Sequence, residues 1–77
     1  MYYVLELQTN GDGTSGNFVF NYSDKGEAEA KFLAVRAAAA ISNVMIHTAV
    51  WMDNRGNIIE KKAYIHPVAP EPEAEEQ

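Results

Sequence analysis

One helix in the middle of the chain constrains the fold more than any other feature. Residues 24–41 read DKGEAEAKFLAVRAAAAI, a stretch filled by residues that favour helices, chiefly alanine, glutamate, lysine, leucine and arginine. Asp24 can cap the first turn, and Glu27 then lies where a capping box requires an acidic residue. Ser42 and Asn43 compete with helical hydrogen bonds and therefore predict its end. Strand-like sequence on both sides predicts that this helix packs on a sheet.

The apolar residues of this helix fall on two stripes when placed at about 100° per residue. The first stripe holds the larger residues and can cover a sheet. The second is rich in alanine, which would let another backbone approach closely, although alanine is also a good exposed helix former. We therefore expect either solvent or a second copy of the chain over the second stripe. The first stripe is Ala28, Phe32, Val35 and Ala39, and the second is Ala30, Leu33, Ala34, Ala37 and Ile41.

Four strand-like segments flank the helix, two on each side. Tyr2–Thr9 and Phe18–Tyr22, separated by a loop rich in glycine and asparagine, predict an antiparallel hairpin. Val44–Asp53 and Asn57–His66 predict a second hairpin. The sequence therefore predicts one α+β domain, residues 1–67, of order β-β-α-β-β. Its four-stranded antiparallel sheet has the strand order 2-1-3-4, and the single helix packs on one face.

The turn of the second hairpin sets its expected register. Gly56 suits the left-handed position of a type I turn with a G1 bulge, in which Asp53 faces Asn57. Counting outward from that pair places Trp51 opposite Ile59. In this register both faces of the hairpin carry large apolar side chains.

A helix can cover only one of those faces, and monomeric proteins rarely expose a second apolar face. We therefore expect the chain to associate with itself or with another protein. The interface is assigned to residues expected to lack cover from their own chain. They are Met45, His47, Ala49 and Trp51 on the third strand, and Leu33, Ala37 and Ile41 on the helix.

Composition and charge exclude several classes of protein. The 77 residues include no cysteine, which excludes disulfides and thiolate chemistry. No apolar run reaches the roughly 18 residues of a membrane span, and the first residues do not resemble a signal peptide, so we expect a cytoplasmic protein without a membrane partner. Residues 68–77, VAPEPEAEEQ, predict a disordered acidic tail. Residues 1–67 are nearly neutral, with seven acidic and six basic residues. Nucleic-acid binding usually requires an excess of basic residues, so this composition does not favour it.

The first loop contains a G-x-G-x-x-G pattern at Gly11, Gly13 and Gly16. Phosphate-binding loops of this pattern lie between a strand and the N-terminus of a helix. Here a strand follows the loop, and Asp12 would repel a phosphate, so the pattern indicates a flexible hairpin loop. A single aspartate is also too few for a calcium site.

No catalytic or metal-binding set emerges from the sequence. His47 and His66 are the only histidines, and the expected register places them on opposite faces, where they cannot share a metal. Ser15, Ser23 and Ser42 lack the histidine and acid that an activated nucleophile needs. We therefore predict a protein that is not an enzyme and has no metal or cofactor. No ligand-binding residues are assigned.

The preferred function is a small homo-oligomeric binding or assembly protein, a homodimer or larger, that acts by contact with itself or another protein. In size and style the chain resembles small accessory proteins of bacteria and their phages. One alternative is an oligomer that sequesters a nucleotide or anion in a pocket between subunits, near Arg36 or Arg55. Another is weak binding of single-stranded nucleic acid by the aromatic strands, although Lys61 and Lys62 point to opposite faces and form no basic stripe.

Overall fold

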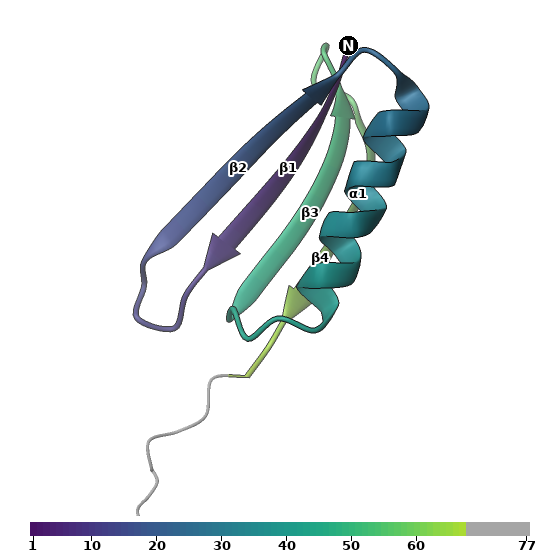
Figure 1. Ribbon diagram of the computed structural model, residues 1–77. Coiled ribbons are helices and arrows are strands. Elements are labelled where there is room, and N and C mark those ends of the chain that lie inside the picture. Colours follow the sequence, from purple (N-terminus) through teal and green to yellow (C-terminus); the bar gives the residue numbers. More distant parts are fainter. Residues whose placement is uncertain (68–77) are drawn as a thin grey trace, which may run out of the picture.

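The computed structural model describes residues 1–67, which form one antiparallel sheet of four strands and one helix (Figure 1). The strand order is β2-β1-β3-β4, so the predicted fold class, element order and sheet order are confirmed. The expected acidic tail, residues 68–77, lies outside the described residues. Within the described part, no helix is long and apolar enough to cross a membrane. The elements are β1 (Tyr2–Thr9), β2 (Ser15–Tyr22), α1 (Lys25–Ala40), β3 (Ile46–Asp53) and β4 (Ile58–Ile65).

Helix α1 begins and ends close to the predicted positions. The carboxylate of Asp24 accepts a hydrogen bond from the backbone N–H of Glu27 at 2.9 Å, so Asp24 is the N-cap. At the other end, Ile41 is the C-cap, and its N–H donates to the carbonyl of Ala38 at 3.3 Å. The buried residues of the helix are the four of the predicted first stripe: Ala28, Phe32, Val35 and Ala39.

The hydrophobic core lies between α1 and the middle of the sheet. The helix lies mainly over β3 and β1, which are the two central strands (Figure 1). Val4 and Ala49 are fully buried beneath it, and the rings of Phe32 and Trp51 lie 6.0 Å apart between centroids. An aromatic pair at this distance packs favourably in a core. Tyr2, Phe20 and Tyr22 pack around the edge of this cluster.

Strand β2 is longer than the sequence predicts, since it begins at Ser15 rather than Phe18. The loop before it closes tightly: the N–H of Asn10 donates to the carbonyl of Thr14 at 2.8 Å, and Gly13 has a φ of +91°. Pairing with β1 therefore continues to the pair Thr9 and Ser15. Cross-strand pairing prevails here over the weak strand propensity of the residues that follow the loop.

The second turn has the predicted geometry, but the strands beyond it do not have the predicted register. Asp53 and Asn57 face each other, and Gly56 has a φ of +86°. Met52 then pairs with Ile58, whereas Trp51 pairs with Glu60. Ile59 is therefore an additional residue, a β-bulge. The expected pairing of Trp51 with Ile59 was wrong, and every later pair is shifted by one residue.

Because of this shift, each side chain of β4 beyond Ile59 lies on the sheet face opposite to the predicted one. Ile65 pairs with Ile46, on the sheet face away from the helix. His66 lies on the helix side instead, where its Nε2 is 2.8 Å from the carbonyl oxygen of Ala39. His47 lies on the same side, so the expectation that the two histidines occupy opposite faces was wrong. A one-residue slip exchanges the faces of every side chain that follows it.

Candidate interaction surface

The sheet face opposite α1 is not covered by any other part of residues 1–67, and we call it the open face (Figure 1). The strand register arranges its sixteen residues in four rows across the sheet. Nine of them are large and apolar, and Lys61 is the only charged one. The rows are Asn21–Tyr3–Met52–Ile58, Val19–Leu5–Val50–Lys61, Asn17–Leu7–Thr48–Ala63 and Ser15–Thr9–Ile46–Ile65.

Several apolar side chains of the open face are exposed. Val19 is 56% exposed, Ile58 54% and Ile65 73%, while Leu5 and Val50 at the centre are half-buried among their neighbours. An antiparallel sheet with one face in water usually alternates apolar and polar residues along each strand. In β1 and β3 each face carries at least two apolar side chains, so these two central strands do not show that simple alternation.

Three residues assigned from the sequence to an interface lie instead in the core. His47 is 3% exposed, Ala49 0% and Trp51 4%, because α1 covers their side of β3. The expectation that they lack cover from their own chain was wrong. Both faces of β3 carry apolar side chains, so alternation alone could not tell which face the helix would occupy. Met45 precedes β3 and is half-buried, and its carbonyl oxygen accepts from the N–H of His66 at 2.7 Å.

The helix residues assigned to the interface lie on the outer side of α1. Leu33 is 42% exposed and Ile41 87%, and Ala37 is also exposed. The predicted second stripe is therefore accessible, on the side of the molecule opposite the open face. Its contact with another copy of the chain remains a prediction.

The structure also forms a polar cluster that the sequence reasoning missed. Ser42 Oγ lies 2.8 Å from Nδ1 of His47, and Nε2 of His47 lies 2.7 Å from Oε2 of Glu6. Gln8 donates to the same carboxylate oxygen at 3.0 Å. A serine, a histidine and a carboxylate in a chain can activate a nucleophile. Here the N–H of Val44 donates to the serine oxygen at 3.3 Å and the imidazole is buried, which favours a structural role.

No spacing in the sequence indicates this cluster, because Glu6 and His47 are 41 positions apart. The pairing of β1 with β3 brings them together: Gln8 is the direct partner of His47, and Glu6 lies two residues further along the same face. The register of these two strands is therefore the signal that would have found it. Both ring nitrogens of a buried histidine need polar partners, and this cluster supplies them.

A second polar region surrounds an open cavity of about 370 Å³ at the end of the sheet where the helix begins. Lys25 and Arg55 line it, and neither forms an ion pair within the described residues. The Asp53 carboxylate also lines it but is engaged in the turn, where it accepts from the N–H groups of Arg55 and Asn57 at 2.9 Å each. Hydrogen bonds from Asn57 hold the pKa of Asp53 below its ordinary value of 3.8.

Arg36, the other arginine considered for ligand binding, pairs with Glu60 on β4 at 3.3 Å. This ion pair ties the helix to the edge strand, so the structure does not bring the two arginines to one site. Within residues 1–67 no group of three or more histidine, aspartate or glutamate side chains is arranged to hold a metal ion.

The fold and its surface define a class of protein: a small β-β-α-β-β domain with a helix on one sheet face and an apolar open face on the other. No family model, curated protein or solved structure matches the chain.

Proposed function

We propose that this chain is a small non-enzymatic assembly protein whose copies bind one another through the open face. The observation that carries the proposal is the composition of that face, which has nine large apolar side chains and one charge. Removing apolar surface from water is the main driving force of association. A second copy supplies an identical apolar face and can cover the first about a two-fold axis.

The size of the open face supports this proposal. Strands spaced about 4.8 Å apart, with a rise of about 3.3 Å per residue, give four eight-residue strands a face of roughly 19 by 26 Å. This flat area is on the order of 500 Å², and the side chains that project from it increase the accessible area. Two such faces together approach the roughly 1,200–2,000 Å² buried in stable interfaces, and one is comparable to the roughly 300–600 Å² of the largest, often functional, apolar patch on a typical monomer.

Charge also favours a second copy of the same chain. The open face has no acidic residue, and its only cation, Lys61, lies on the edge strand β4. A lysine at the rim of an interface can bury its methylene groups and keep its ammonium in water. Two faces related by a two-fold axis therefore meet without placing charges of the same sign at the centre.

Light scattering tests this proposal directly. The wild-type protein is expected to have at least twice the protomer mass of 8.5 kDa. Leu5→Glu places a charge at the centre of the open face and is expected to lower the mass, while circular dichroism shows a folded chain. Leu33→Glu is the matched control, because Leu33 is an exposed leucine on the outer side of α1.

A wild-type monomer would contradict the proposal. A loss of mass in Leu33→Glu with no loss in Leu5→Glu would move the contact from the open face to the outer stripe of the helix. Loss in Leu5→Glu alone supports the open face. Because side chains of the open face do not contact α1, the Leu5 variant is expected to remain folded.

The cavity beside Lys25 and Arg55 supports a second candidate function, the binding of a small anion. Two cations without an ion-pair partner in residues 1–67 favour a negatively charged ligand at that end of the sheet. A ligand that binds only the folded state raises the melting temperature. Inorganic phosphate and nucleoside triphosphates should therefore stabilise the wild type more than Arg55→Ala. Equal melting curves with and without these anions would remove this function.

A further inference from the structure

The sheet has two edges, and they differ in a way that points to a second contact. Strand β2 forms one edge and β4 the other. The outer N–H and C=O groups of an edge strand can pair with another strand, and natural proteins usually guard against this with charges, proline or a β-bulge.

Two of these features protect strand β4 from pairing with another strand. It carries three consecutive charged residues, Glu60, Lys61 and Lys62. The bulge at Ile59 interrupts its ladder with β3 and changes the local twist. A second strand would have to match this irregular edge and accommodate its charges.

Strand β2 has none of these features. Its eight residues, SGNFVFNY, include no charge and no proline, and its register with β1 is unbroken from Ser15 to Tyr22. Antiparallel pairing of this strand with itself therefore brings no charges of the same sign together. The contrast between the two edges makes β2 the strand that is open to pairing.

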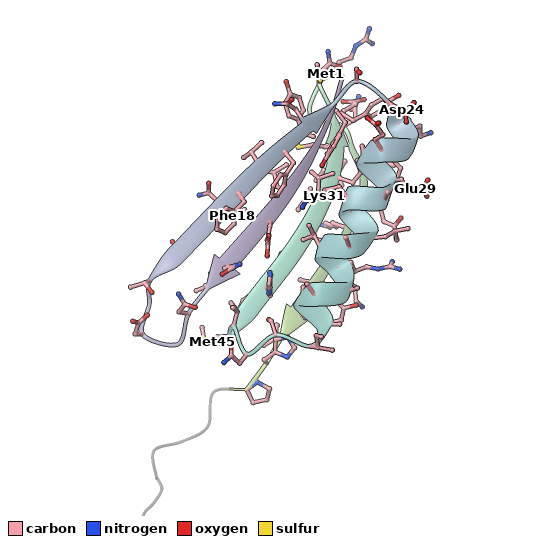
Figure 2. The ribbon with its side chains drawn as sticks, viewed as in Figure 1. Met1, Phe18, Asp24, Glu29, Lys31 and Met45 are labelled. Atoms are coloured by element: carbon pink, nitrogen blue, oxygen red, sulfur yellow. The ribbon has the colours of Figure 1, made fainter. Side chains whose placement is uncertain are left out.

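Two side chains in the middle of β2 are also left uncovered, one on each face of the sheet. Phe18 is 51% exposed on the helix side, because α1 lies over β3 and β1 rather than over the sheet edge. Figure 2 shows Phe18 on β2, separated from the helix. Val19 is 56% exposed on the open face. Its neighbour Phe20 differs, since Nζ of Lys31 lies 4.1 Å above its ring. The uncovered residues thus lie at the centre of the unguarded strand.

We propose that β2 pairs in antiparallel fashion with β2 of a second copy, joining two four-stranded sheets into one continuous sheet. Antiparallel strands related in this way have a two-fold axis perpendicular to the sheet. Both helices then lie on one side, and the two open faces join into one. This contact is separate from the packing of one open face on another. The two contacts together give a tetramer with two kinds of two-fold interface.

The register limits which side chains meet. Asn10 donates to Thr14 across the loop, and bonded pairs alternate along an antiparallel ladder. The N–H groups of Ser15, Asn17, Val19 and Asn21 therefore point away from β1. A two-fold axis near the middle of the strand places Phe18 opposite Phe18 or Phe20 of the second copy. Either register covers the exposed aromatic ring with another one.

Hydrogen exchange distinguishes a paired edge from a free one. If β2 pairs with a second copy, the outward amides of Asn17 and Val19 should exchange at least about tenfold more slowly than the outward amides of Lys61 and Ala63 on β4. These four amides all lie on edge strands, so the β4 pair is a matched internal control. Equal, rapid exchange on both edges would overturn the proposal.

Two variants test the contact by mass. Asn17→Pro removes an outward N–H that β1 does not use, and Phe18→Glu places a charge on the helix side of β2, away from the open face. Each is expected to halve the mass measured for the wild type. Lys62→Glu places an acidic side chain on the helix side of the other edge strand, β4, and is expected to leave the mass unchanged. An unchanged mass in both β2 variants would also overturn the proposal.

The same measurements separate this inference from the proposed function. If only the β2 contact forms, the wild type is a dimer that Phe18→Glu dissociates and Leu5→Glu does not. If only the open faces pack, Leu5→Glu dissociates the dimer and Phe18→Glu does not. If both contacts form, each variant leaves a dimer, and the double variant is a monomer.

Discussion

Nε2 of His47 lies 2.7 Å from Oε2 of Glu6, and this contact joins β3 to β1 beneath the C-terminal half of α1. The imidazole is buried, and its other nitrogen is 2.8 Å from the hydroxyl of Ser42. A buried polar ring is tolerated because both nitrogens have partners. The strand pairing that builds the core thus also satisfies this buried imidazole.

Glu6→Ala tests this contact, since it leaves His47 and Gln8 without their shared acceptor. We expect the free energy of unfolding to fall by about 1–3 kcal/mol, the range for an unsatisfied buried polar group. Glu29→Ala is the control, because Glu29 is exposed on the helix and its side chain forms no hydrogen bond or ion pair within the described residues. Urea denaturation at one protein concentration compares the two variants. Equal losses of stability would show that the contact contributes nothing.

Phe32→Ala tests which side of the helix faces the core. Phe32 is fully buried against Trp51, so the variant is expected to lose about 3–5 kcal/mol of stability. Its neighbour Leu33 points outward, and Leu33→Ala is expected to cost less than about 1 kcal/mol. Thermal unfolding of both variants checks the difference. A larger loss for Leu33→Ala would mean that the outer stripe is the more strongly covered one.

Gly56→Ala tests the turn between β3 and β4. Its φ of +86° is disfavoured for a residue with a side chain, although a Cβ there would meet no other atom within 4 Å. We expect a loss of about 1–2 kcal/mol from backbone strain alone. Gly16→Ala is the matched control, because its Cβ would also meet no atom within 4 Å and its φ is ordinary. Urea midpoints that fall equally for both variants would contradict this account of the turn.

Asp53 makes the same turn dependent on pH. Hydrogen bonds from Asn57 lower the pKa of Asp53 in the folded state below 3.8. A carboxyl group with a lowered folded pKa stabilises the fold above its unfolded pKa, and this contribution disappears as the pH falls through the folded value. NMR titration of the Asp53 carboxyl should therefore give a midpoint below 3.8. The amide signals of Arg55 and Asn57 should shift with the same midpoint, and in Asp53→Asn that transition should be absent. A midpoint at or above the ordinary value would contradict the hydrogen-bonded turn.

Much of the fold followed from local patterns. The cap at Asp24, the buried stripe containing Phe32 and the left-handed Gly56 were all predicted, because each depends on residues within a few positions of one another. The strand order also followed, since a helix that crosses the sheet returns the chain beside its first strand.

The assignment of faces did not follow from the sequence. Both sides of β3 carry apolar side chains, so the pattern could not show that α1 would cover Trp51 and leave Val50 on the open face. The bulge at Ile59 was also missed. The turn between Asp53 and Asn57 has the same sequence pattern whether or not the strand that follows it contains a bulge. That one residue decides which face Ile65 and His66 occupy.

The sequence alone determined the elements, their order and the excess of apolar side chains, since these depend on composition and on spacing along one segment. Only the tertiary structure decided which apolar face is buried, where Glu6 meets His47 and which edge strand is unguarded. The physical reason is that these features depend on pairing between segments distant in the chain. A shift of a single residue in that pairing exchanges the two faces of a strand.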